Sequence, residues 1–199
     1  MLGMNEQELK EVFGTINDFD RLVLNEIKNV HKVATIGSLI LMLCAVDYLK
    51  SFRFGLKAID KNTFDLLKEK YGQNERLDRI NREELHPSKY YKDFIREYLM
   101  PINDCYNPED IYKNLRCGLV HNYSDRIFKY HFVESRHQDK SAFHLMSDGK
   151  GIYFNVDNFY IDFMSMCRVF FKEAKNKEEI QRNIFDFRSF VGFLHVFDS

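Results

Sequence analysis

VATIGSLILMLCAVDYLKSFRF, residues 33–54, is the stretch of this chain that decides the fold. A helix that crosses a membrane needs about 20 apolar residues, and the apolar run here is interrupted at Asp47. The chain starts MLGMNEQELK, which lacks the basic and apolar regions of a signal peptide. The segment therefore predicts a buried helix of a soluble protein with no membrane partner, ended by Gly55.

Helical periodicity continues on both sides of this segment. Residues 5–30 place apolar side chains three and four positions apart, which predicts a long amphipathic helix. Only 3 Pro and 9 Gly interrupt the 199 residues, which favours helices over a sandwich. Further helices are expected at about 62–71, over 88–103, where Pro101 ends the pattern soon after, and onward from Pro108. Two more are expected over 157–174 and 177–196.

The period changes between the third and fourth of these further helices. Residues 128–135 alternate between apolar and polar, and residues 143–156 hold two short apolar runs around SDGKG, a strong turn signal. We predict a small antiparallel β-element at about 128–156. The chain is then one domain, residues 1–199, of the mainly α class, with the β-element inserted before the last two helices.

Composition limits the partners and chemistry that we expect. Net charge is −1, so no global basic field attracts nucleic acid, and any such contact must be local. The four cysteines form no CxxC pair, which indicates reduced thiols in a cytoplasmic protein. His131, His137 and His144 lack the spacing of a zinc site and are interpreted as surface histidines. We expect no metal and no cofactor.

LRCGLVHNY, residues 115–123, is the stretch whose residues suggest chemistry, because Arg116 and His121 stand close together on a predicted helix. In an α-helix, five residues separate them by about 140° and roughly 7.5 Å along the axis. They would straddle the packing stripe. To converge, the arginine side chain must bend back, the helix must loosen at His121, or a second helix must contribute. The packing stripe comprises Ile111, Leu115, Gly118, Leu119 and Asn122.

This pattern of Arg, four residues, then His, late in a helical chain, resembles the HEPN superfamily (higher eukaryotes and prokaryotes nucleotide-binding), and in particular its members in bacterial toxin and defence systems. The resemblance implies a HEPN-like helical bundle and metal-independent RNA cleavage, with Arg116 and His121 as catalytic residues. It also implies a homodimer across the motif helix, and an antitoxin or nucleotidyltransferase as a partner. We assign substrate binding to Asn122, Tyr123 and Asp47.

One position departs from the family pattern. Catalytic members commonly carry a polar residue after the arginine, whereas this chain has Cys117, with Asn122 placed to supply an amide from the other side of His121. The alternative is a non-catalytic HEPN-like module that binds a partner protein, a nucleotide or RNA. A purely structural interpretation also stays open, in which Arg116 pairs with an acid such as Asp47 or Glu109 and His121 hydrogen-bonds at a helix end.

Two more residues of this constellation have alternative explanations. Asp47 interrupts an apolar helix, so it either pairs with a basic group on a neighbouring element or supports a site; the first is favoured, because an unpaired buried carboxylate is unfavourable. Gly118 has no Cβ and would let another helix approach closely, and we assign it to the dimer contact.

The segment LKSFRFGLK, residues 49–57, also allows two interpretations. Its cations and phenylalanines could form a small RNA-binding patch. We favour instead the end of a core helix with its cations facing solvent. The cations are Lys50, Arg53 and Lys57, and the phenylalanines are Phe52 and Phe54.

Overall fold

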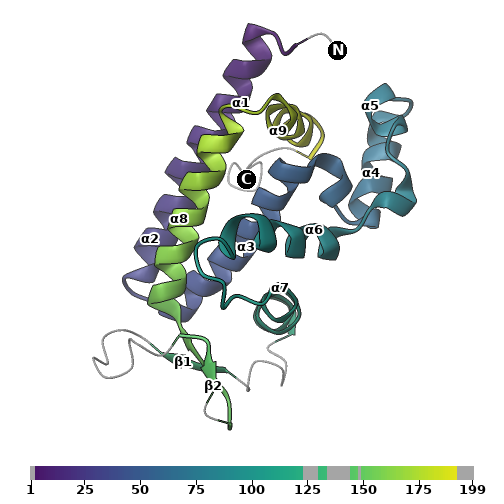
Figure 1. The fold of residues 1–199 in the computed structure, drawn as a ribbon. Coiled ribbons are helices and arrows are strands. Elements are labelled where there is room, and N and C mark those ends of the chain that lie inside the picture. Colours follow the sequence, from purple (N-terminus) through teal and green to yellow (C-terminus); the bar gives the residue numbers. More distant parts are fainter. Residues whose placement is uncertain (1–2, 123–129, 134–143, 148, 192–199) are drawn as a thin grey trace.

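The computed structural model describes residues 3–122, 130–133, 144–147 and 149–191, and Figure 1 shows their arrangement. The described residues are mainly helical, so the predicted mainly α class is confirmed. In chain order the elements are α1 (Glu6–Asp18), the π-helix η1 (Phe19–Leu24), α2 (Asn25–His31), α3 (Thr35–Phe54), the 3-10 helix η2 (Gly55–Ala58), α4 (Lys61–Tyr71), α5 (Glu75–Asp78), the 3-10 helix η3 (Arg82–Glu84), α6 (Pro87–Phe94), the π-helix η4 (Ile95–Leu99), α7 (Pro108–Asp110), the π-helix η5 (Ile111–Asn122), β1 (Tyr130–Val133), β2 (Met146–Ser147), β3 (Ile152–Asn155), α8 (Val156–Ala174) and α9 (Glu178–Val191).

Helix α3 is the centre of the fold, as its apolar sequence predicts. It packs against α2, α6, α8, α9 and η5, and Leu39, Val46 and Phe52 are fully buried. Residues Thr35–Ala58 are long and apolar enough to cross a membrane by length and composition alone, but 61% of their most apolar 18-residue stretch is buried within the protein. Its apolar side chains are therefore the core of the bundle.

Gly55 ends α3 for a reason that the structure makes visible. Its φ is +67°, a left-handed conformation that glycine adopts readily. A Cβ at this position would also lie 2.7 Å from Oδ1 of Asn183 on α9. The Asn183 side-chain amide in turn donates to the Arg53 carbonyl at 2.7 Å. The predicted helix end is confirmed, and the hydrogen bond from Asn183 holds α9 against it.

Residues Glu6–His31 form one long helical rod made of α1, η1 and α2, which confirms the amphipathic helix predicted over 5–30. Asn5 caps it, with Glu8 completing a reciprocal capping box. Helix α8 lies beside the rod in Figure 1. Ring contacts join the two, with the ring centre of Phe19, in the middle of the rod, 5.6 Å from that of Phe171, and with His31, at its end, stacked on Tyr160 at 4.1 Å.

The β-element differs from the antiparallel one that we predicted. The strand order is β1-β3-β2, with β1 parallel to β3 and only the two-residue β2 antiparallel to it. Alternation predicts strands but not their directions, and the dozen residues between β1 and β2 are enough for the chain to cross to the other edge. The predicted antiparallel element is therefore a mixed sheet.

The helix that carries LRCGLVHNY also differs from the expected α-helix. Asn107 caps α7, with Pro108 in the first position as predicted, but from Ile111 to Asn122 the backbone is π-helical. Gly118 is buried within the chain, as are Ile111, Leu115 and Leu119, and η5 packs on α3 and α6. The close contact that we assigned to a dimer is therefore intramolecular, and the homodimer stays a prediction.

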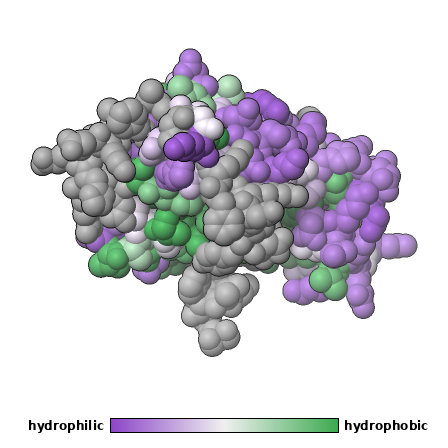
Figure 2. Space-filling model, turned by 90° about the horizontal axis from the view of Figure 1, so that it is seen from below, coloured by the Kyte–Doolittle hydropathy of each residue, from purple (hydrophilic) through white to green (hydrophobic). Residues whose placement is uncertain are grey.

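The two sides of the molecule differ in polarity. Figure 2 looks at the end that carries the sheet; apolar side chains are exposed in the left half of the view, whereas the right half, on the side of α4 and α5, is mainly hydrophilic. That second half carries ion pairs on its surface, such as those of Lys68 with Asp78 and of Arg82 with Asp65. The segment after α3, residues 60–85, is rich in charges of both signs and forms this solvated face, as such a composition usually does.

Candidate functional site

The π-helical geometry of η5 changes the relation between positions 116 and 121. Each N–H of a π-helix bonds to the carbonyl five residues earlier, so residues five apart are little more than one turn apart and lie on the same side. The 140° separation expected for an α-helix therefore does not apply to Arg116 and His121. Asn122 is the last residue of η5, and Tyr123 lies outside the described residues.

Arg116 reaches from η5 to Asp47 on α3. Its Nε and Nη2 both donate to Asp47 Oδ2 at 3.0 Å, and its guanidinium lies 5.7 Å from the centre of the Tyr112 ring. The Arg116 side chain is 18% exposed and that of Asp47 24%. The favoured interpretation of Asp47, pairing with a basic group on a neighbouring element, is confirmed. The same contact fixes the plane of the guanidinium.

A second cation, Lys50, holds Asp47 from its own helix. The Lys50 Nζ lies 3.3 Å from Asp47 Oδ1 and donates to the carbonyls of Asp47 and Ala58 at 3.3 and 3.0 Å. An ammonium has three N–H donors, and these three acceptors match them. Lys50 is 6% exposed, so its predicted place facing solvent is wrong. Its role is to position Asp47.

The remaining cations of residues 49–57 serve structural contacts as well. Arg53 pairs with Glu97 at 3.0 Å and with Glu179 at 3.6 Å, and Lys57 pairs with Glu84 at 3.0 Å. Among the phenylalanines of this segment, Phe52 is fully buried. The segment is thus the end of a core helix, as we favoured, but with its cations engaged in ion pairs.

Burial and the charge of Asp47 both shift the pKa values of the groups around it. Burial lowers the pKa of Lys50, and Asp47 offsets only part of that effect. For Arg116 burial also acts downward, but the Asp47 carboxylate outweighs it and the pKa of Arg116 is raised. Burial, together with Asp47, raises the pKa of the nearby Cys44 thiol. The site is therefore one carboxylate shared by two cations, with a protonated thiol beside it.

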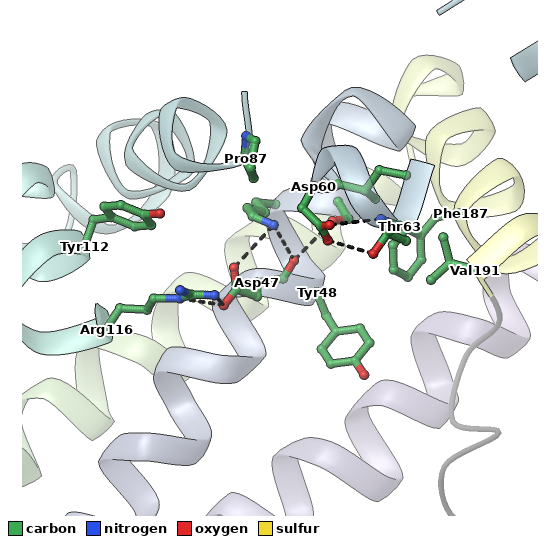
Figure 3. A pocket seen from close by; sticks show the side chains of 12 residues that line it. Asp47, Tyr48, Asp60, Thr63, Pro87, Tyr112, Arg116, Phe187 and Val191 are labelled. Atoms are coloured by element: carbon green, nitrogen blue, oxygen red, sulfur yellow. Dashed lines mark hydrogen bonds and ion pairs between the residues drawn. The ribbon is translucent and has the colours of Figure 1, made fainter. Parts of the chain in front are cut away.

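Arg116 and Asp47 lie at the wall of a pocket of about 550 Å³, drawn in Figure 3. Such a volume is typical of small-molecule sites. Arg116 and Tyr112 lie on one side of the view, and Asp60, Thr63 and Phe187 lie on the other. The lining residues come from α3, α4, α6, η5 and α9, with Ile59 and Asp60 between η2 and α4: Asp47, Tyr48, Lys50, Ser51, Ile59, Asp60, Thr63, Pro87, Tyr112, Arg116, Phe187 and Val191.

The carboxylate of Asp60 is the second acid in this pocket. It caps α4: Oδ1 accepts from the Thr63 backbone N–H at 2.9 Å, and Oδ2 accepts from the Thr63 hydroxyl at 2.7 Å. Burial acts to raise the pKa of Asp60, but these hydrogen bonds outweigh burial and lower it. Asp60 is therefore an ionised acceptor at the end of the pocket away from Arg116.

The histidines of the β-element lie apart from this pocket. His131 is exposed, as predicted, and His137 lies outside the described residues. His144 is not the surface histidine that we expected: its Nδ1 accepts from the Asn155 backbone N–H at 3.1 Å, and its Nε2 lies 2.9 Å from the Tyr106 hydroxyl. Within the described ranges, no His, Cys, Asp and Glu residues gather as a metal site would require.

The sequence did not predict all of the functional residues of this pocket. It singled out Arg116 and Asp47, which the structure joins, but it did not assign Lys50 to a site and did not mention Asp60 or Tyr48 in one. Asp60 carried a readable signal, because an Asp three residues before a threonine at the start of a helix is a typical cap. Nothing in the sequence indicates that this cap faces Arg116.

We compared the chain with protein-family models, with curated proteins and with solved structures, and none of these three comparisons found a match. The candidate site therefore stands on its own geometry.

Proposed function

We propose that the protein is a metal-independent endoribonuclease of the HEPN type, in which Arg116 holds the scissile phosphate and His121 transfers the proton. The observation that carries this proposal is the π-helical turn of η5, which puts positions 116 and 121 on the same side. The wall of a 550 Å³ pocket is formed at the same place by Arg116. Both features are what a two-residue phosphate-cleaving site needs.

The chemistry follows from the two side chains. The ribose 2′-oxygen attacks phosphorus, so the O2′–P bond forms while the P–O5′ bond breaks. An imidazole titrates near neutrality, so His121 accepts the proton of the 2′-hydroxyl or, when protonated, donates one to the leaving 5′-oxygen. The Arg116 guanidinium stabilises the charge on the phosphate oxygens. The products are a 2′,3′-cyclic phosphate and a 5′-hydroxyl.

Asp47 acts through Arg116 in this scheme. It engages Nε and Nη2 of a guanidinium that carries five N–H groups. The guanidinium of Arg116 is thereby held in one orientation before the substrate arrives, which lowers the entropy lost on binding. Asn122 and Tyr123 remain proposed substrate contacts, and a homodimer in the cytoplasm, with an antitoxin or nucleotidyltransferase as partner, remains part of the proposal.

The test is cleavage of single-stranded RNA by the purified protein in excess chelator. We expect RNA to be cut and DNA, which lacks the 2′-hydroxyl, to stay intact. His121→Ala and Arg116→Ala should each lose about 10²–10⁴ of the rate. Matched controls are His131→Ala and Arg79→Ala, which change exposed residues outside the pocket. Equal rates for His121→Ala and the wild type would show that the cleavage arises elsewhere.

A second candidate function is binding without cleavage. The observation that favours it is the pairing of Arg116 with Asp47, because the carboxylate occupies donors that a phosphate would use. The presence of Cys117 after the arginine, where a polar residue is common in catalytic HEPN proteins, agrees with it. Binding of a partner protein, a nucleotide or RNA without any cleavage of RNA, while Arg116 stays paired with Asp47, would establish this function instead.

A further inference from the structure

We propose that the pocket beside Arg116 binds one unpaired base of the RNA substrate, with a preference for guanine that Asp60 sets. The proposal rests on the proposed function, since it names the substrate of the same site. Figure 3 places a phosphate-binding cation and an ionised acceptor at opposite sides of one pocket, Arg116 at one and Asp60 at the other. A nucleotide offers the complementary groups, an anionic phosphate at one end and a base edge with N–H donors at the other.

The walls of the pocket between these ends suit a planar base. Tyr48 and Phe187 meet edge to face, with ring centres 6.3 Å apart, and Tyr112 stands on the Arg116 side. Unpaired bases bind proteins mainly by stacking on aromatic side chains, and the base edges are then read by hydrogen bonds. Ile59 and Pro87 add apolar surface to the same lining.

The two cations of the site differ in what they offer to a ligand. Lys50 has all three of its N–H donors matched by Asp47 and Ala58. It therefore holds the pocket together and does not read the base. Arg116 lines the Asp47 side of the pocket, and a guanidinium binds phosphate oxygens by charge-assisted hydrogen bonds, which makes it the residue that meets a phosphate.

Asp60 can distinguish the bases because an ionised carboxylate only accepts hydrogen bonds. Each of its oxygens takes one bond from Thr63, and an ionised carboxylate has about four lone-pair sites. Guanine presents two adjacent N–H donors, at N1 and N2, that match two acceptor oxygens. Uracil presents one N–H between two carbonyls, which a carboxylate repels. Adenine and cytosine each place an amino group beside an acceptor nitrogen.

Asp60→Asn is the variant that tests the guanine preference without removing the cap of α4. Asparagine caps helices as well as aspartate does, and its oxygen keeps the bond from the Thr63 N–H that Oδ1 now accepts. The new amide then takes the place of Oδ2, beside the Thr63 hydroxyl, which can accept in place of donating. One acceptor of the pair becomes a donor while the fold is retained.

The experiment is titration calorimetry with the 3′-monophosphates of guanosine, adenosine, cytidine and uridine. We expect the wild type to bind the guanosine nucleotide on the order of tenfold to a hundredfold more tightly than the uridine one, the range of one bidentate base contact. Asp60→Asn should remove that ratio. Asp65→Asn, on the next turn of α4 and paired with Arg82 outside the pocket, is the matched control and should preserve it.

Two further results decide the proposal. Tyr48→Leu should weaken all four nucleotides and leave their order unchanged, because it removes a stacking face. Equal affinities for the four nucleotides in the wild type, or an unchanged ratio in Asp60→Asn, would overturn the guanine pocket. RNA cleavage by the same preparations is scored separately, so loss of base preference with cleavage intact rejects this inference and keeps the proposed function.

Discussion

Asp47 is one carboxylate between two cations that are themselves mostly buried. The side chains of Lys50 and Arg116 are 7% and 18% exposed. Removing one partner of a buried ion pair is destabilising, because the other is left buried without its counter-charge. Here a single substitution leaves two cations facing each other, so the residue matters to stability before it matters to any substrate.

Asp47→Asn should therefore lower the free energy of unfolding by about 3 kcal/mol, measured by denaturant titration. The matched control is Glu83→Gln, which breaks an exposed pair with Lys61 at 3.1 Å and should change the stability by less than about 1 kcal/mol. Adding Lys50→Met to Asp47→Asn should recover part of the loss, since one unpaired cation is gone. Equal losses in Asp47→Asn and Glu83→Gln would contradict the picture of a shared buried carboxylate.

His144 gives the fold a dependence on pH. Burial lowers its pKa to about 4, although Asp162 acts in the opposite direction, and its Nδ1 is already an acceptor for the Asn155 N–H. In the unfolded chain a histidine has a pKa of about 6.5. Between these values the unfolded state binds the proton and the folded state does not. Acid therefore favours unfolding in this window.

The stability should fall as pH is lowered from about 6.5 to about 4, by on the order of 3 kcal/mol in total from this residue. Above pH 6.5 its contribution should be constant. Urea titrations across this range measure the slope. His144→Gln should lose that part of the slope, whereas His131→Gln, an exposed neighbour on β1, should keep it. An unchanged slope in His144→Gln would assign the acid sensitivity to other groups.

At the scale of single elements, η5 shows where sequence periodicity stops being informative. The apolar residues Ile111, Leu115 and Leu119 are spaced for an α-helix, and all three are buried. The spacing therefore predicted correctly which residues pack. It could not predict that the hydrogen bonds run to the fifth residue, because the same side chains stay buried in either helix. The angle between Arg116 and His121 depends on that difference alone.

At the scale of the whole molecule, the sequence predicted the helices and missed how distant segments meet. The central α3, the long rod and Gly55 as a helix end were all readable, because each depends on local pattern. The direction of β1 was not readable, since parallel pairing with β3 depends on a crossover and not on residues within the strands. The same holds for Asp60, whose place opposite Arg116 arises only when residues of α3, α4 and η5 meet around one pocket.

Assembly is the whole-molecule prediction, and Gly118 separates its two explanations. We expect light scattering to give twice the 23.9 kDa mass of one chain. Gly118→Leu inserts a side chain into a buried position of η5 and should lower the stability by about 1–3 kcal/mol. The variant should still give twice the mass of one chain by light scattering, since the contact of Gly118 is within one chain. A folded Gly118→Leu variant that runs as a monomer would return Gly118 to a dimer contact.

The central place of α3 has a consequence for the order in which the chain is made. Its partner α2 precedes it, but α8 and α9, which cover other faces of it, begin only at Val156 and Glu178. At 5–20 residues per second, a ribosome needs roughly 6–25 s to synthesise the residues between the end of α3 and the start of α9. Throughout that interval the most apolar helix of the protein is without its last cover. The nascent chain should therefore be a client of chaperones that hold apolar segments until the final helix emerges.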